Sequence, residues 1–216
     1  MKRFISPLIL IIPFLILSCG KKKKEATEET AQEVVAEQTC SYSYDNRSTI
    51  FAWKAFKTNE KIGVGGTFDT INVTSTTANS LRDLIKSIKF DIATNSVNSN
   101  NPDRDKKIFE FFFGKMENGD KISGQVKKVS GDENSGIVTL FVMMNSVGND
   151  VEMTYDFSRN VLNMEGEINL GDFNGQEAVK ALNDKCKDLH TGKDGVSILW
   201  PDVKLTLTTT IDKVCE

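Results

Sequence analysis

The sequence predicts an all-β fold, an antiparallel barrel or sandwich of about eight strands with one inserted helix. Short apolar segments alternate in hydrophobicity with the period of two that strands require, and clusters of Gly, Asn and Asp separate them at hairpin spacing. One segment near the C-terminus carries a helical stripe instead. The 216 residues allow one large domain or two small ones, and they contain no internal repeat and no sign of a second domain.

The first 18 residues have the pattern of a secretory signal peptide. Met1-Lys2-Arg3 is a positive start, and the apolar stretch over residues 4–17 is too short and too interrupted to cross about 30 Å of hydrocarbon. It ends in Ile16-Leu17-Ser18-Cys19, which resembles a bacterial lipobox, where the cysteine is acylated and becomes the new N-terminus. The alternative is an ordinary signal peptide with an incidental cysteine. The resemblance implies lipid attachment at Cys19 and a place in the cell envelope, anchored in the outer membrane and facing the periplasm or the cell surface.

Residues 19–44 are predicted to form a flexible tether, followed by one domain over residues 45–216. Four lysines at positions 21–24 precede a segment of Glu, Ala, Thr and Gln, which has too little apolar surface to offset the entropy of ordering it. The lysines either contact anionic headgroups or belong to a solvated stalk.

The first three strands of the domain are predicted from residue 48, over 63–69 and over 85–93. Each has an apolar row on one face: Phe51 and Trp53, then Val64 and Phe68, then Ile88, Phe90 and Ile92. The glycines at positions 63, 65 and 66 suit a strand that bends at a barrel corner. Five further strands are expected over residues 122–129, 137–144, 151–157, 161–170 and 203–211.

Two segments interrupt the strands. Residues 104–113, introduced by Asn101-Pro102-Asp103, are expected to form a short helical turn or loop that carries Phe109 and Phe111. Asn174-Gly175-Gln176-Glu177 fits a capping box, with the Asn174 side chain accepting from the first helical amides. The helix after it places four side chains on one stripe and ends near Gly192: Ala178, Leu182, Cys186 and Leu189. We expect this helix to lie across the barrel as a lid or plug.

Composition argues against several classes of function. The 27 basic and 30 acidic residues give a net charge of −3, without the basic footprint that nucleic-acid binding requires. His190 is the only histidine, which excludes a multi-histidine metal centre and weakens a reading as a Ser-His or Cys-His hydrolase. Cys186 lies one helical turn earlier, but a cation at a helix C-terminus is the preferred interpretation of His190. No metal, no cofactor and no enzymatic activity is predicted.

Three cysteines remain after lipidation at Cys19, so one disulfide can form in an oxidising compartment. In a closed antiparallel barrel the first strand neighbours the last, which favours Cys40 with Cys215. A bond between Cys186 and Cys215 would instead pin the helix to the final strand. The second pairing is preferred, because Cys40 falls in the predicted tether. The alternative for Cys186 is a reduced, buried thiol.

Three blocks of residues point to a known family. They are Ser48-Thr49-Ile50-Phe51-Ala52-Trp53, then Val64-x-Gly66-x-Phe68, then Ile92-x-Thr94-x-Ser96-Val97 with Arg104-Asp105 and Phe111-Phe112-Phe113-Gly114. On these blocks residues 48–214 resemble the YceI-like family, bacterial polyisoprenoid-binding proteins with an elongated lipocalin-like barrel. The resemblance implies an antiparallel eight-stranded barrel of that type. The chain departs from the family pattern at Ala55-Phe56-Lys57, where a histidine is usual, and in a long segment over residues 171–201, which looks like a lipoprotein subgroup.

An eight-stranded barrel is just wide enough to be filled by its own side chains or to hold one slender ligand. The pattern alone favours a filled core, whereas the resemblance implies a cavity for a hydrophobic amphiphile, an isoprenoid or acyl lipid, bound without catalysis. The expected wall is Phe51, Trp53, Val64, Phe68, Ile88, Phe90 and Ile92, with Phe109 and Phe111 closing one end. Arg104 and Asp105 are expected to fix loop geometry rather than to contact a headgroup. The alternative function is a structural or adaptor lipoprotein with a filled core that binds an unidentified protein partner.

Overall fold

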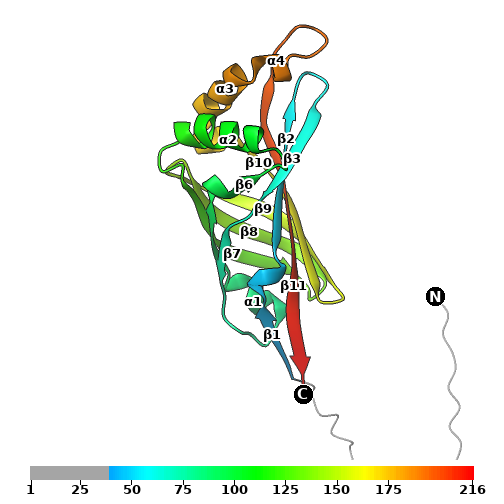
Figure 1. The fold of residues 1–216 in the computed structure, drawn as a ribbon. Helices are drawn as coiled ribbons and strands as arrows, with labels where there is room; N and C mark the ends of the chain where they lie inside the picture. Colours follow the sequence, from blue (N-terminus) through cyan, green and yellow to red (C-terminus); the bar gives the residue numbers. More distant parts are fainter. Residues whose placement is uncertain (1–38) are drawn as a thin grey trace, which may run out of the picture. The chain divides into compact units, whose positions relative to one another are not determined.

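The computed structural model describes residues 39–216, which form one strongly curled antiparallel sheet with short helices at both of its ends (Figure 1). The predicted signal peptide, Cys19 and the tether as far as residue 38 lie outside the described residues. All neighbouring strands of this sheet pair antiparallel. The antiparallel, barrel-like fold class is therefore confirmed.

Each of the eight predicted strands is present, and three short strands add to them. The predicted strands are β2 (Ile50–Lys57), β3 (Ile62–Phe68), β5 (Lys89–Ala93), β7 (Lys121–Gly131), β8 (Ser135–Met144), β9 (Val147–Ser158), β10 (Val161–Asn169) and β11 (Leu199–Cys215). The additional strands are β1 (Cys40–Tyr44), β4 (Ile71–Thr74) and β6 (Val97–Asn98). The strand order is β4-β5-β7-β8-β9-β10-β11-β2-β3-β6, and β1 pairs with β11 beside this path. The two edges of the sheet meet where β3 turns into β4, since Asp69 N donates to Ser96 O at 2.9 Å and Ala93 N donates to Thr70 O at 3.1 Å.

The end of the sheet near α1 (Leu81–Lys86) is packed solid. Leu81, Leu84 and Ile85 of this helix are fully buried, against a core that includes Leu162 and Ile211. The strand predicted over residues 85–93 thus begins four residues late, at Lys89. The helix is only six residues long, and Ser80 caps it by accepting from Asp83 N. Such a short segment carries too little periodicity to be distinguished from a strand by pattern.

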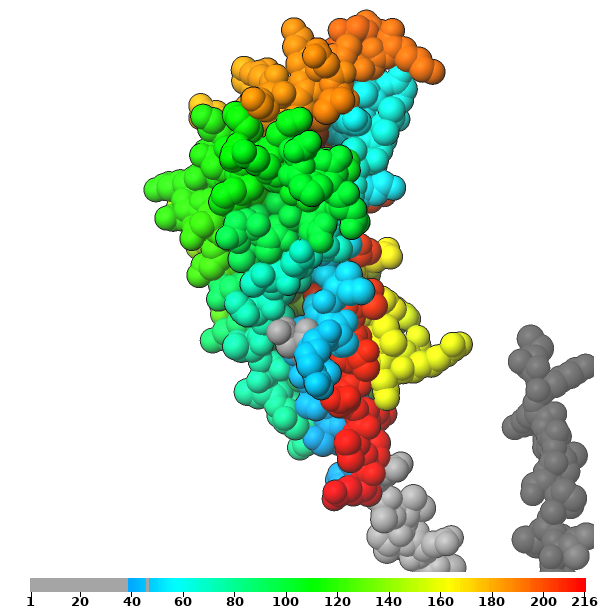
Figure 2. Space-filling model, in the orientation of Figure 1, coloured from blue at the N-terminus to red at the C-terminus, as the bar shows by residue number. Residues whose placement is uncertain are grey.

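Helices α2 (Pro102–Phe111), α3 (Gln176–Lys185) and α4 (Lys187–His190) cover the opposite end of the sheet (Figures 1 and 2). The first corresponds to the helical turn or loop predicted over residues 104–113, but it begins and ends two residues earlier, with Asn101 as its cap and Pro102 in its first turn. Its fixed φ and missing N–H make proline well suited to that position. Among residues 39–216, none of the helices is long and apolar enough to cross a membrane.

The C-terminal helix differs from the prediction at its start and in its middle. Asn174 is not its cap: this residue has φ 53° and ends the 3-10 turn Leu170–Phe173, while Gly175 precedes α3 without a side-chain cap. An asparagine tolerates this left-handed conformation better than most residues, which explains its presence there. The helix also breaks at Cys186, so that α3 and α4 are separate and the predicted single stripe is divided.

The disulfide joins Cys40 and Cys215, not Cys186 and Cys215. The preferred pairing was wrong because Cys40–Tyr44 is not part of a tether: it forms β1, and its ladder with β11 places Cys40 directly opposite Cys215. The folded part consequently begins near residue 40 rather than at 45. Cys186 is a buried free thiol.

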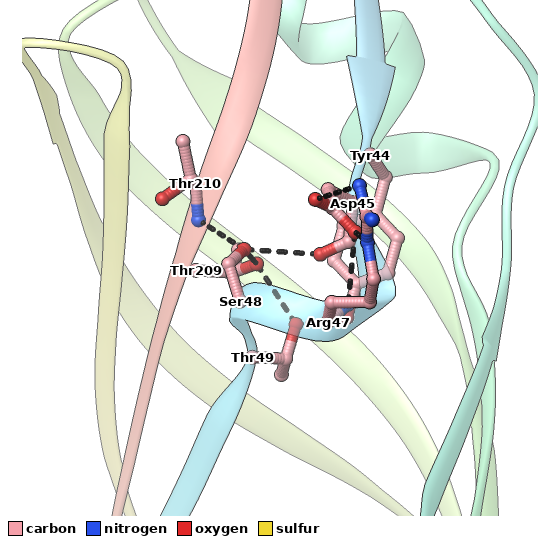
Figure 3. Close-up of polar contacts among 7 residues, drawn as sticks. All are labelled: Tyr44, Asp45, Arg47, Ser48, Thr49, Thr209 and Thr210. Atoms are coloured by element: carbon pink, nitrogen blue, oxygen red, sulfur yellow. Dashed lines mark hydrogen bonds and ion pairs between the residues drawn. The ribbon is translucent and has the colours of Figure 1, made fainter.

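A cluster of hydroxyl groups holds the corner between β1 and β2 against β11 (Figure 3). Tyr44 OH pairs with Thr49 Oγ1, and Thr209 Oγ1 lies 2.8 Å from Thr49 Oγ1 and 3.1 Å from Ser48 Oγ. The backbone N–H of Thr210 donates to Ser48 Oγ at 2.9 Å. Buried polar groups are stable when they are paired in this way. Ser48 and Thr49, at the start of the first family-like block, therefore have a structural role.

Candidate ligand-binding cavity

A cavity of about 530 Å³ occupies the end of the sheet beneath α2, α3 and α4. Its volume lies within the range of roughly 300 to 1,000 Å³ typical of small-molecule sites. The walls are almost wholly apolar and come from both halves of the curled sheet: Phe51, Trp53, Ala55, Val64, Phe68, Phe90, Ile92, Ile122, Leu140, Val142, Met144, Val151, Met153, Ile168, Val203 and Leu205. The molecule thus has a filled core at the α1 end and a hollow one at the other.

The alternation of β2 is what turns its aromatic row toward the cavity, because successive strand residues point to opposite faces. Trp53 is paired across the sheet with Gly66 on β3 and Leu205 on β11. A Cβ atom at position 66 would lie 2.8 Å from the Trp53 ring and 2.5 Å from the carbonyl oxygen of Asn98. The glycine of the second family-like block therefore makes room for the indole, whose Nε1 donates to Thr67 O at 3.3 Å.

A β-bulge shapes the rim of the cavity on β11. The register with β2 shifts between Leu199, opposite Lys57, and Val203, opposite Ala55. Pro201, which has no N–H to donate to a ladder, lies within the shifted stretch, as is usual for proline in a strand. Trp200 beside it lines the cavity and donates its Nε1–H to Thr58 O at 2.7 Å.

Six of the nine sequence-predicted ligand residues line this cavity: Phe51, Trp53, Val64, Phe68, Phe90 and Ile92. Ile88 does not, because it packs into the filled core on the α1 side. Phe109 is 38% exposed, and Phe111 contacts Lys185, whose Nζ lies 4.6 Å from the ring centroid. That these six residues contact a ligand stays a prediction.

The face of α2 toward the cavity carries Ile108 and Phe112 instead of Phe109 and Phe111. Residues four positions apart share one face of a helix, so Ile108 on this face brings Phe112 to the cavity as well. Phe113, just after the helix, completes the cover and packs edge-on against Phe112 at a centroid distance of 4.9 Å. Reading residues 104–113 with a helical period would have identified this pair.

Arg104 and Asp105 fix the connection from β6 to α2. The Asp105 carboxylate accepts from the backbone N–H of Ser99 at 2.8 Å and from its hydroxyl. Arg104 donates from Nε to Ser99 Oγ at 2.8 Å, and its backbone N–H donates to the side chain of Asn101 at 3.0 Å. These bonds hold α2 over the cavity, which is the structural role expected of the pair. Arg104 also lines the cavity.

Polar groups gather only at the helical end of the cavity. Besides Arg104, the charged residues that line it are Lys57, Asp103 and Lys107. Lys57 is fixed by a hydrogen bond from Nζ to the carbonyl oxygen of Leu189 at 2.7 Å. The cavity is therefore amphipathic along its length, with an apolar interior and one polar end.

His190 is at this polar end, and it is not the helix-terminal cation expected from the sequence. It is the last residue of α4, as anticipated, but its side chain is only 9% exposed and lines the cavity. Burial, followed by the nearby positive charge of Lys57, lowers its pKa to about 4. The imidazole is therefore neutral at physiological pH, and attraction of a protonated ring to the helix dipole does not apply.

The free thiol of Cys186 also lines the cavity. Within residues 39–216, no group of three or more His, Cys, Asp or Glu side chains is placed to hold a metal ion. Cys186 belongs to the stripe that is expected to face the barrel, whereas the inward position of His190 is not expected from the sequence, because the break between α3 and α4 carries no glycine or proline.

Comparison with known proteins identifies the family. No curated protein matches the chain. Among solved structures, a polyisoprenoid-binding domain from Saccharophagus degradans implicated in plant cell wall breakdown is similar, with a TM-score of 0.54 and 11% identity over 82% of this chain and 99% of that one. BcnA of Burkholderia cenocepacia has a TM-score of 0.53 and 12% identity, covering 79% of this chain and 99% of that one. At these identities the likeness shows the fold.

The family model of the YceI-like domain matches residues 42–211. This range begins inside β1 and ends inside β11, so it includes most of the sheet, helices α1 to α4 and the residues that line the cavity. The chain belongs to the YceI-like family.

Proposed function

We propose that the domain binds one elongated lipid, an isoprenoid or acyl amphiphile, in the cavity beneath α2–α4, and that it does so without catalysing a reaction. The observation that carries the proposal is the cavity of about 530 Å³, apolar along its depth and polar at one end. Removal of each methylene group from water contributes about 0.8 kcal/mol, so a chain lying along these walls gains affinity with length. The similar Saccharophagus degradans structure is itself a polyisoprenoid-binding domain, which supports the same class of ligand here.

Blocking the cavity from β2 tests this proposal. Ala55 lines the cavity, whereas Ala52 lies on the same strand and does not. We expect Ala55→Phe to reduce the lipid bound per protein in native mass spectrometry, after incubation with a bacterial lipid extract. Ala52→Phe adds the same ring outside the cavity and serves as the matched control. Wild-type protein that takes up no lipid would refute the proposal and favour the adaptor alternative.

The proposal extends to the membrane. The sequence Ile16-Leu17-Ser18-Cys19 and the polar segment after it support a lipid anchor at Cys19, which would hold the cavity close to a bilayer that supplies or receives the ligand. We place this anchor in the outer membrane, with the domain facing the periplasm or the cell surface. Fractionation of cells that express Cys19→Ala tests it: the variant should leave the membrane pellet, and full retention there would contradict the anchor.

A further inference from the structure

The hydrogen bonds around His190 define which of its ring nitrogens carries a proton. Nδ1 lies 3.0 Å from Asn183 Oδ1. The Asn183 amide is itself oriented by Ser197, because its Nδ2 donates to Ser197 O at 3.3 Å and its Oδ1 accepts from Ser197 Oγ at 3.2 Å. A carbonyl oxygen accepts and cannot donate, so Nδ1 must be the donor to Asn183. The neutral ring then has its lone pair on Nε2.

Nε2 is an acceptor without a hydrogen-bond partner in the described part of the chain, and it is not fully enclosed by the protein. No other hydrogen bond is formed by the ring within residues 39–216. In that part of the chain, the only fully enclosed side-chain nitrogen or oxygen atom without a partner is Oγ1 of Thr58, so Nε2 is not fully enclosed. Asn183, which holds the other nitrogen, does not line the cavity, whereas His190 does. From these contacts we infer that the edge of the ring that carries Nε2 is the edge turned toward the ligand space.

Lys57 supplies donors at the same end of the cavity. Its Nζ has three hydrogens, one of which is committed to Leu189 O, and its charge acts on His190. An ammonium donor and an imidazole acceptor together suit a group that can both accept and donate. A hydroxyl does this with a single oxygen atom. An ether or an ester lacks the proton for Nε2, and a phosphate dianion or a carboxylate offers only further acceptors.

We propose that the cavity selects neutral amphiphiles whose head is an alcohol or phenol hydroxyl, with the O–H donating to Nε2 of His190. The inference rests on the proposed lipid binding and adds the chemistry of the headgroup to it. The competing head is an anion attracted by Lys57, Arg104 and Lys107, which outnumber the one carboxylate of Asp103 at this end. An anion facing Nε2 would require a protonated ring, and with a pKa of about 4 only about one ring in a thousand is protonated at neutral pH.

Three probes with the same apolar chain distinguish these heads: farnesol, farnesyl methyl ether and farnesyl phosphate. For the wild-type protein we expect farnesol to bind about tenfold more tightly than the ether, because one additional hydrogen bond accounts for a difference in affinity of about this size. His190→Phe should abolish this preference and leave the affinity for the ether unchanged. His190→Gln retains an acceptor and should keep part of the preference. Asp188→Asn alters an exposed residue of α4 outside the cavity lining, leaves the acceptor in place, and should behave as wild type.

A measurement on the unaltered protein makes the test independent of any variant's folding. His190 is the only histidine, so ¹⁵N-histidine labelling gives one pair of ring signals. We expect Nε2 to resonate as an unprotonated nitrogen and to shift on addition of farnesol but not of the ether. Equal affinity for alcohol and ether, an Nε2 that carries the proton, or tighter binding of farnesyl phosphate than of farnesol would overturn the headgroup inference while lipid binding stands. Failure of all three probes to bind, together with no lipid taken up from the bacterial extract, would overturn the proposed function with it.

Discussion

Burial of His190 predicts a specific dependence of stability on pH. The pKa of the folded protein's imidazole is lowered to about 4, against 6.5 for an unperturbed ring. As the pH falls, the unfolded chain therefore takes up this proton before the folded protein does. The free energy of unfolding is unaffected above pH 6.5 and decreases as the pH falls from there toward about 4. His190→Gln removes the titrating group and should remove this component.

The magnitude follows from the two pKa values. At about pH 5 the preferential protonation of the unfolded chain lowers the free energy of unfolding by about 2 kcal/mol. Below about pH 4 this decrease reaches its limit of roughly 3 kcal/mol. At about pH 7.5 the contribution is close to zero. We therefore expect wild-type protein to lose about 2 kcal/mol more than His190→Gln between those two pH values.

Urea unfolding of both proteins at the two pH values measures this difference directly. Hydrogen bonds lower the pKa of carboxyl groups such as Asp132 and Asp194, which also costs stability in acid. These groups are the same in both proteins and cancel in the comparison. The reasoning would be refuted by parallel pH profiles, or by a ring signal of the single histidine that titrates near its ordinary value in the folded protein.

Three further predictions concern the frame of the cavity. Replacement of both Cys40 and Cys215 by serine should lower the free energy of unfolding by up to about 5 kcal/mol, since their bond closes a loop of 175 residues; an unchanged urea midpoint would contradict this. Asp105→Asn should lower the free energy of unfolding by about 1.5 to 3 kcal/mol, because it weakens the bonds to Ser99. Asp103→Asn removes the same charge from the first turn of α2 and should lower it by less in the same urea assay. Gly66→Ala should lower the free energy of unfolding by roughly 1 to 3 kcal/mol, because its Cβ atom would clash with Asn98 O. Gly114→Ala is the control and should lose little thermal stability, since the atom nearest to its Cβ would be 3.4 Å away. Equal losses in the two variants would refute the packing argument.

The period of two located the eight principal strands, because each has an apolar row long enough to repeat. Strands β4 and β6 could not be found in this way, since they have only four and two residues. Strand β1 is as long as β5 and alternates Cys40, Tyr42 and Tyr44 with serines, but the assignment of residues 19–44 to a tether overlooked this pattern. The pairing of these three strands depends on neighbours distant in sequence, as when β1 joins the last strand. The same long-range contact determined the disulfide, which spacing alone left open between Cys40 and Cys186.

The wall of the cavity was predictable on the strands and not on the helices. Alternation determines which strand residues share a face, so Phe51, Trp53 and Phe90 could be placed together from sequence. On α2 the run of phenylalanines drew attention to Phe109, whereas the helical period brings Ile108 to the cavity. The environment of His190 depends on Asn183 and Ser197, whose contacts form only after α3 and α4 fold against the start of β11.

The contrast between the two ends of the sheet affects how a ligand exchanges. At the α1 end the core is filled and the first and last strands are covalently joined, whereas at the other end short helices cover a hollow. Local opening in proteins occurs where the least surface is buried. Displacement of α2–α4 can therefore admit or release a ligand while the β1–β11 ladder stays closed. The residence time of the ligand and the lifetime of the folded chain are then controlled by separate barriers, so that cargo turnover can change without loss of the protein.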